Sequence, residues 1–429
     1  MRSFWQIFLL ELTAFRRSHA LGFLVVAALA WMLVLPHIIT SDGTAEGVRE
    51  LYLHYSLGGV FALLVITLLA SATGSIARER AAKRLQLTLV RPVGRFVIVA
   101  AKSAALTIIG ASTLALAALI LFVQVERKEM ARPCNHVLSP ILPSPREEAK
   151  VMYEAYMASP ETPEAVKRTK KEVVLRLLEN RAIDRYETIV TNAVAKWRFE
   201  LSPFGESPFY ALPTTIFARF RFSGAYNHRE MAVGELQIGC HRGSISNLTQ
   251  STLTVPLNGI SSTIVQPPNE LSFSNCGKTA LQFRPRRDIQ LLVPADAFGW
   301  NLVRTYLELV AILALLIAFG LFLSAALGRS VAIFVAFVIL LLGEMSPSVI
   351  ESYPDELEEK LSDRIGLVLT RAAAEITRPV SSLNPLEKLA TDDCVEAREV
   401  VRVVLLDVVA VPFLLFILAA FILPRKQEN

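Results

Sequence analysis

The residues of this sequence that could take part in nucleotide chemistry do not form a complete site. The segment Ser274-Asn275-Cys276-Gly277-Lys278-Thr279 ends in the Gly-Lys-Thr triplet of a phosphate-binding loop, but Ser272 stands where the first glycine belongs. The sequence contains neither H-E-x-x-H nor G-x-G-x-x-G. We therefore expect no enzymatic activity in this chain, no ATP hydrolysis of its own and no cofactor bound to it.

Four cysteines lie in polar segments that we place outside the membrane, which is typical of disulfide formation in an oxidising compartment. Cys240 and Cys276 share a strand-rich region and are the first expected pair. Cys134 and Cys394 are a second expected pair, which would link two external segments. The alternative is a metal site built on Cys134-x-His136 and Cys240-His241, but neither has the spacing of a structural zinc site, so we predict no metal.

Ionisable residues also lie near the ends of apolar stretches, and four of them are candidates for a transport role: Lys102, Arg304, Glu308 and Asp407. Several of these lie near the outer interface, where a charge costs little. Arg304 and Glu308 are four residues apart on one predicted helix, so a simple ion pair is the alternative. Lys102 lies near the inner end of its span, from which its long side chain can extend to the cytoplasm.

The chain that carries these residues has the composition of an integral membrane protein. It has 429 residues, 53% of them hydrophobic, and a mean hydropathy of +0.44. No basic and aromatic pattern typical of nucleic-acid binding is present, so the only surface partner expected from composition is membrane lipid. Six stretches are long and apolar enough to cross a bilayer, namely 19–38, 57–76, 96–123, 302–325, 329–345 and 400–423.

The first seventeen residues predict a helix that lies in the membrane interface. Phe4, Ile7, Phe8, Leu12 and Phe15 fall near one helical face, and charged residues fall elsewhere. The alternative is that these residues are only the start of the first span.

Between the third and fourth spans the sequence changes character, and no window of 125–300 could cross a membrane. Residues 144–195 predict helices, and 197–297 predict short strands separated by Pro, Gly and Asn turns, as in a β-sandwich or jelly roll. We therefore divide the chain into 1–124, an extracytoplasmic α+β domain at 125–300, and 301–429, with a second external loop at 346–398. An amphipathic helix is expected around 355–377.

The distribution of charge orients these spans. With both termini in the cytoplasm, the inner segments hold Arg16, Arg17, Arg329, Arg425 and a strongly basic loop, whereas 39–56 and 346–398 are richer in acids. This arrangement follows the positive-inside rule. The fold class expected is thus membrane α-helical, with six spans in two groups of three.

The basic loop runs over 77–95 and contains Arg78, Arg80, Lys83, Arg84, Arg91 and Arg95 against the single acid Glu79. Basic charge alone would serve only to fix the topology. Leu85, Leu87 and Leu89 favour a second interpretation, because a short helix that docks into a groove of a partner needs apolar side chains.

This loop resembles the loop between the second and third spans of ABC-2 type exporter permeases. The resemblance is carried by Glu79-Arg80, Leu85, Leu87, Leu89, Arg91-Pro92-Val93, Arg95 and Lys102, although Lys83-Arg84 replaces the usual Gly-Thr. In that family the loop is a coupling helix on a separate ATP-binding subunit, and the chain begins with an interfacial elbow helix. The resemblance extends to 301–429, where Arg378-Pro379-Val380 and Leu383-Asn384-Pro385 precede the last span.

The resemblance implies the permease subunit of an ATP-driven exporter in a bacterial inner membrane. It implies a cytoplasmic ABC ATPase as partner, which would bind the ATP and Mg²⁺, and a homodimer or a heterodimer with a second permease. Two alternatives remain at this point. One is a permease that extracts lipopolysaccharide or lipoprotein, and the other is a membrane-anchored receptor or assembly scaffold without transport.

Overall fold

The structure is a computed structural model, and it describes most of the chain in two units. The described residues are 2–17, 19–39, 45–81, 94–142, 144–159, 171–199, 215–221, 223–224, 231–238, 241–248, 252–258, 270–352 and 385–425. The helical unit comprises 1–134 and 296–429, and the strand-containing unit comprises 135–295. These limits lie close to the 125 and 300 expected from composition, and each unit is described below by itself.

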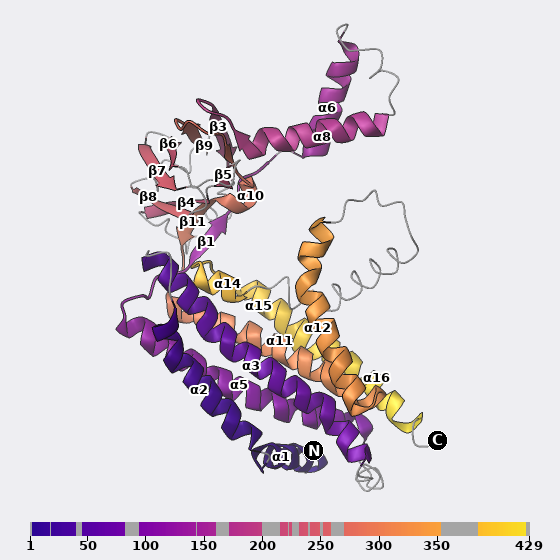
Figure 1. Ribbon diagram of the computed structural model, residues 1–429. Coiled ribbons are helices and arrows are strands. Elements are labelled where there is room, and N and C mark those ends of the chain that lie inside the picture. Colours follow the sequence, from indigo (N-terminus) through magenta and orange to yellow (C-terminus); the bar gives the residue numbers. More distant parts are fainter. Residues whose placement is uncertain are drawn as a thin grey trace. The chain divides into compact units, whose positions relative to one another are not determined.

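The helical unit is built from long apolar helices (Figure 1). Its elements are α1 (Arg2–Arg17), α2 (Ala20–Ile38), α3 (Ala45–Ala81), α5 (Arg95–Arg127), α11 (Phe298–Ala326), α12 (Arg329–Ser352), α14 (Pro385–Ala390), α15 (Ala397–Val403), the π-helix η1 (Val404–Ala410) and α16 (Val411–Arg425). Four stretches are long and apolar enough to cross a membrane: α3, α5, α11 and the continuous run α15-η1-α16. The pair α1 and α2, which is bent by 64°, makes a fifth if it counts as one span.

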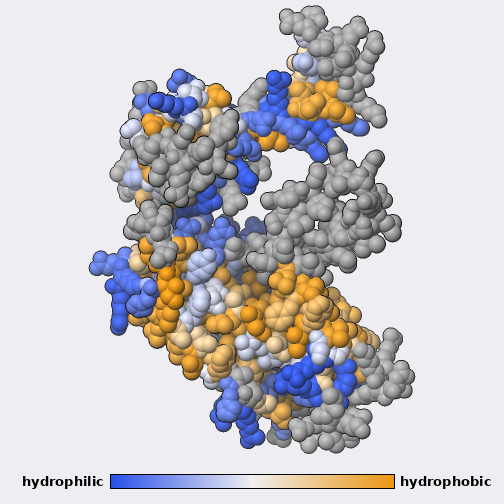
Figure 2. Space-filling view, viewed as in Figure 1, coloured by the Kyte–Doolittle hydropathy of each residue, from blue (hydrophilic) through white to orange (hydrophobic). Residues whose placement is uncertain are grey.

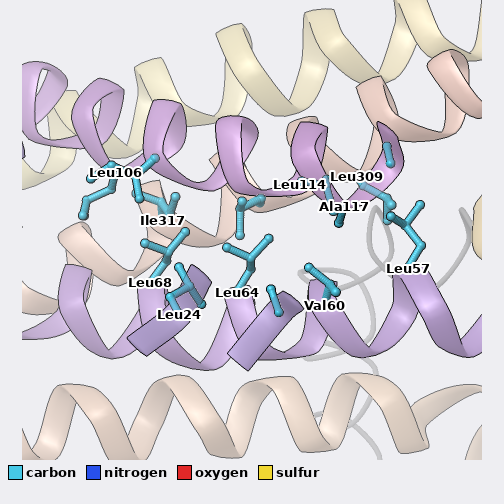
Figure 3. Packing of buried hydrophobic residues seen from close by; sticks show 14 of the residues in the cluster. Leu24, Leu57, Val60, Leu64, Leu68, Leu106, Leu114, Ala117, Leu309 and Ile317 are labelled. Atoms are coloured by element: carbon cyan, nitrogen blue, oxygen red, sulfur yellow. The ribbon is translucent and has the colours of Figure 1, made fainter. Parts of the chain in front are cut away.

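Helix α11 is the central helix of this unit. Of its most apolar stretch of 18 residues, 78% is buried, whereas the corresponding share for the last span is 22%. Leucines and valines that recur every three or four residues along α3 pack against α5 and α11, as the spacing of an apolar helical face requires. Figure 3 shows this packing, with Leu64 and Leu68 of α3, Leu106 and Leu114 of α5, and Ile317 of α11. The core therefore joins helices from both ends of the sequence.

Glycine allows α5 to approach its neighbours closely at one point. A Cβ on Gly110 would lie 2.3 Å from Leu313 Cδ2 and 2.8 Å from Leu68 Cδ1, so a larger side chain would displace two neighbouring helices. This close approach keeps α3, α5 and α11 in one tightly packed group.

The outer surface of the helical unit is apolar along the sides of the helices. Figure 2 shows hydrophobic side chains over these sides and hydrophilic ones toward the helix ends. Large apolar residues such as Phe23, Phe334, Phe413 and Phe421 are exposed. An apolar surface of this extent is the surface of a membrane protein, because lipid rather than water covers it.

The strand-containing unit holds two four-stranded antiparallel sheets. The first has the order β1 (Asn135–Leu138), β11 (Ile289–Pro294), β4 (Thr215–Arg221), β8 (Thr252–Asn258). The second has the order β3 (Val194–Arg198), β9 (Glu270–Asn275), β6 (Met231–Ile238), β7 (His241–Leu248). A small third sheet joins β2 (Thr188–Ile189), β10 (Leu281–Gln282) and β5 (Ser223–Gly224).

The two larger sheets share one core, as in a sandwich. Phe220 of β4 and Phe273 of β9 are fully buried with ring centroids 6.1 Å apart, and Phe283 and Trp197 complete the aromatic cluster. Alternation of buried and exposed residues along β9 is the pattern expected of a strand with one face in a core.

Helices in this unit end earlier than the sequence analysis predicts. Helix α6 (Pro145–Ala158) packs on α8 (Lys171–Glu187) through Ala149, Val174 and Leu178, and a single turn, α10 (Pro285–Asp288), precedes β11. The predicted helical region reached 195, but the chain turns at Asn192, whose φ is 62°, and Ile189 is buried in the sandwich core. Burial in that core outweighs the helical spacing of these residues.

Part of the predicted external loop also differs from expectation. Helix α12 continues to Ser352, so 346–352 is helical, and α14 begins at Pro385. The amphipathic helix expected around 355–377 lies outside the described residues.

The two expected disulfides have different outcomes. Cys134 and Cys394 are bonded, with a Cα–Cα distance of 5.0 Å, and both belong to the helical unit. The preferred pair Cys240–Cys276 is wrong for this structure, because Cys276 is a free, exposed thiol; Cys240 itself lies outside the described residues. The strand register agrees with this outcome. Ile238, the last residue of β6, pairs with Leu271 near the start of β9, whereas Cys276 follows the other end of β9, about 17 Å further along the strand.

We predict that replacing both Cys134 and Cys394 by serine lowers the free energy of unfolding by about 2–5 kcal/mol. The reason is that the disulfide joins two residues 260 positions apart in the sequence and so restricts the unfolded chain. The thermal unfolding midpoint of the purified protein in detergent measures this loss. Cys276→Ser is the matched control and should leave the midpoint unchanged. Alkylation of Cys134 or Cys394 in denatured, unreduced protein would contradict the prediction.

Candidate functional site

Four polar side chains form a buried cluster at one end of the helical unit, and we call it the Lys102 cluster. Lys102 Nζ on α5 donates hydrogen bonds to Glu11 Oε2 on α1 at 2.6 Å, to Glu79 Oε1 on α3 at 2.8 Å and to Ser75 Oγ on α3 at 2.9 Å. Ser75 Oγ in turn donates to Glu11 Oε1 at 3.0 Å. All three protons of the ammonium group therefore have an acceptor.

The local sequence explains why these side chains meet. Ser75 and Glu79 are four residues apart, so they lie on the same face of α3. On α1, Phe8 is buried against Ala101 and Ala105, and Phe4, Ile7 and Leu12 pack around it. This is the apolar face predicted for the first helix. Its packing on Ala101 and Ala105 places Glu11 of α1 beside Lys102 of α5.

The sequence analysis expected Lys102 to extend to the cytoplasm, and that expectation is wrong. Lys102 is only 2% exposed, because two carboxylates from neighbouring helices enclose its ammonium group. Burying one charge without partners is costly, whereas a fully hydrogen-bonded ion cluster offsets most of that cost. The cluster thus fixes α1, α3 and α5 at one relative position.

Arg80, the residue directly after Glu79, connects α3 to α11. Its guanidinium donates to the carbonyl oxygens of Ser324 at 2.7 Å and Ala325 at 2.9 Å, which are among the last carbonyls of α11. Ser324 Oγ also accepts a hydrogen bond from the Ala77 backbone N–H at 3.0 Å. Helix ends leave unpaired carbonyls with partial negative charge, so an arginine here both satisfies and stabilises the end of α11.

The structure brings together only some of the residues predicted to couple to an ATPase. Glu79 and Arg80 belong to this end of the helical unit, and Arg95 is exposed at the start of α5. Leu85, Leu87, Leu89, Arg91 and Pro92 lie outside the described residues. Glu11, Ser75 and Ser324 were missed. For Glu11 a signal existed, since it is the one acid in the otherwise apolar and basic first helix.

At the other end of the helical unit a second set of contacts holds the segment between α14 and α15. Arg49 on α3 forms an ion pair with Asp392, and Arg49 Nε donates to the Met130 carbonyl at 2.7 Å. Asn301 on α11 donates to the Asp393 carbonyl at 3.0 Å and accepts from the Val395 N–H at 2.9 Å. With the Cys134–Cys394 bond, these contacts bind the segment to α3, α5 and α11.

The predicted ion pair between Arg304 and Glu308 is not formed. Arg304 instead binds the Asp296 carboxylate at 2.8 Å and the Val395 carbonyl at 3.3 Å. Glu308 is fully buried, and neither carboxylate oxygen has a hydrogen-bond partner among the described residues. Asp407 is also buried, at 3% exposure, in the π-helix η1. The Arg304 guanidinium is held by Asp296 and Val395 and so does not bind Glu308.

The remaining candidate chemistry is structural. Within the described part of the chain, no group of three or more His, Cys, Asp and Glu side chains could hold a metal ion. In the loop that resembles a phosphate site, Asn275 accepts from the Gly277 N–H at 3.0 Å and donates to the Thr279 carbonyl at 2.9 Å. This loop is therefore a turn stabilised by the Asn275 amide.

Comparisons with known proteins give no relative. No family model matches the sequence, and no curated protein or solved structure matches it significantly. The functional argument therefore rests on the residues and geometry described above.

We predict that Lys102→Met lowers the free energy of unfolding by about 3–5 kcal/mol, because it leaves the half-buried carboxylates of Glu11 and Glu79 without their cation. Thermal or denaturant unfolding in detergent measures the loss. Arg127→Met, at the exposed other end of α5, is the control. The triple change Lys102→Met, Glu11→Gln and Glu79→Gln should recover most of the loss. If the triple variant is no more stable than Lys102→Met, charge compensation is not what the cluster provides.

Proposed function

We propose that this chain is the membrane-spanning subunit of an ATP-driven exporter in a bacterial inner membrane. A separate cytoplasmic ATPase, which binds ATP and Mg²⁺, docks on the loop 77–95. The observation that carries the proposal is the set of contacts at the base of this loop. The Lys102 cluster and Arg80 connect the loop's first residues to α1, α3, α5 and α11.

These contacts give a route by which a movement of the loop would reach the whole helical unit. Glu79 and Arg80 are consecutive. Glu79 is bound to Lys102 of α5, which also binds Glu11 of α1, whereas Arg80 is bound to α11. Helix α3 has 37 residues and is about 55 Å long, so it acts as a rod that reaches through the membrane. Closure of an ATPase pair would then shift α3 and α11 together as packed rigid elements.

The proposal requires six spans in two groups of three. Four are long enough by themselves, and in this proposal α2 and the apolar part of α12, Arg329–Leu341, complete the six. An even number of spans places both termini in the cytoplasm, on the side of the basic loop. The strand-containing unit then lies outside, where it gates the outlet or receives substrate.

A second permease subunit, identical or related, completes the transport path in this proposal. The last span supports it, because only 22% of its most apolar window is buried within the chain. Val401, Leu405 and Phe413 on this span are exposed. Lipid covers part of this surface and a second subunit covers the rest.

Two other functions make different demands. A receptor or scaffold without transport needs no ATPase. It therefore offers no reason for the loop 77–95 to be held to the surrounding helices at its first residues. A permease that extracts lipopolysaccharide or lipoprotein shares the ATPase and differs in substrate. Association with an ATPase separates the first alternative from the proposal, and analysis of bound lipid separates the second.

We predict that Leu85→Asp with Leu87→Asp abolishes co-purification of the ATPase, because acidic side chains cannot enter an apolar groove. The measurement is a pull-down of this protein from its native membrane, with the ATPase identified by mass spectrometry and by its ATP-binding activity. Leu9→Asp with Leu10→Asp, on the exposed side of α1, is the matched control. Equal recovery of the ATPase with all three proteins would remove the basis of the proposal.

The free thiol of Cys276 tests the orientation of the chain. In a Cys240→Ser background, a membrane-impermeant maleimide should label Cys276 in intact cells, because Cys276 is exposed on the strand-containing unit. Cys276→Ser is the control and should abolish the label. Labelling that occurs only after the inner membrane is broken would place this unit in the cytoplasm and the basic loop outside.

A further inference from the structure

The strongest unexplained feature of the helical unit is a face of α11 that carries three buried polar residues. Asn301, Thr305 and Glu308 follow at intervals of four and three residues, so they lie along one side of the helix. All three are between 0% and 1% exposed. The oxygen and the nitrogen of the Asn301 side-chain amide are both bound, as described above. Among the described residues, Thr305 Oγ1 and both oxygens of Glu308 have no hydrogen-bond partner.

The segment from α14 to α15 carries the charges that act on this face. Two charged side chains act on Glu308 from that segment: Glu399 on α15 and Lys388 on α14. They are bound to each other, with Lys388 Nζ 2.6 Å from Glu399 Oε2. The cation that could neutralise Glu308 is therefore already engaged by a second acid.

The helices η1, α16, α5 and α3, which also pack on α11, bring few ionisable groups to the part of α11 around Glu308. The π-helix η1 carries only Asp407, and α16 carries no acid or base before Arg425. On α5 the ionisable side chains lie near the ends of the helix, with Lys102 in its own cluster. On α3, Arg49 is paired with Asp392, and Tyr52 binds Gln124 through its hydroxyl.

An ionised carboxylate in this position would be buried with neither a counter-ion nor a hydrogen-bond donor. Such a charge costs far more free energy than a neutral carboxylic acid in the same place. We propose that Glu308 is a proton-binding site, which holds its proton while the segment from α14 to α15 lies on α11. This inference does not depend on the exporter function, because it rests only on the surroundings of Glu308.

The geometry also defines what release of the proton would involve. When the O–H bond of Glu308 breaks, the proton goes to water and the carboxylate remains as a buried anion. This anion would be a second carboxylate near the Lys388–Glu399 ion pair, and the two acids would compete for the Lys388 ammonium. The docking of the segment from α14 to α15 on α11 is therefore sensitive to the protonation of Glu308.

The test compares the wild-type protein with Glu308→Gln, which imitates the neutral acid in shape and polarity. Folding should favour the protonated form of Glu308, while the unfolded chain ionises it. The contribution of Glu308 to stability should therefore be present at low pH and be lost as pH rises. Relative to Glu308→Gln, the unfolding equilibrium constant of the wild type should rise by up to about tenfold per pH unit above the ordinary glutamate pKa of about 4.3, until the folded protein itself ionises Glu308.

Glu126→Gln, an exposed acid at the end of α5, is the matched control and should follow the wild type. The same pH dependence in wild type and Glu308→Gln would overturn the proposal. If Glu308→Gln does not fold, wild-type protein in membranes can be treated with a hydrophobic carbodiimide, which reacts with protonated buried carboxyls. Mass spectrometry should then find the adduct on Glu308, in an amount that falls as pH rises. A missing adduct, or one independent of pH, would equally overturn the proposal.

Discussion

One ammonium group shared by two carboxylates holds α1, α3 and α5 together at one end of the helical unit. Lys102 lies on α5, Glu11 on α1 and Glu79 on α3, so removing any one of them leaves a charge on another helix without one of its partners. Apolar packing alone tolerates sliding between helices, because it has no preferred direction. A three-way ion cluster with defined hydrogen bonds does not, and it fixes α1 across the ends of two spans. Arg80, next to Glu79, extends this restraint to α11.

The two ends of the unit are held by different interactions. The end with the Lys102 cluster depends on charge, and the opposite end combines the Arg49–Asp392 pair, the Asn301 hydrogen bonds and the disulfide. Between them the packing is almost wholly apolar, with Glu308 and Asp407 as buried acids. Polar interactions are worth most where water is scarce, so a few of them at each end define the register of long helices that apolar contacts would leave loose.

Much of the fold follows from the sequence, because burial repeats with the period of each element. Four of the six expected spans, the apolar face of α1 and the strand-rich region could all be predicted. What failed depends on contacts between distant residues. The spacing of Arg304 and Glu308 predicts a pair, but Asp296 and the Val395 carbonyl lie closer to the guanidinium. Likewise, Ile189 keeps helical spacing yet is buried in a sandwich core. No local pattern contains that information.

Helix α11 is the element on which both ends converge. Its last carbonyls are bound by Arg80, its first turns bind the 393–395 segment through Asn301, and Glu308 lies between. A displacement that begins at Arg80 can reach the segment between α14 and α15 along α11, through Asn301, and along α3, through Arg49. A close-packed helix transmits such a displacement with little loss, since packed interiors are nearly incompressible. Glu308 on α11 is then placed where a change in its charge would alter how firmly this segment is held.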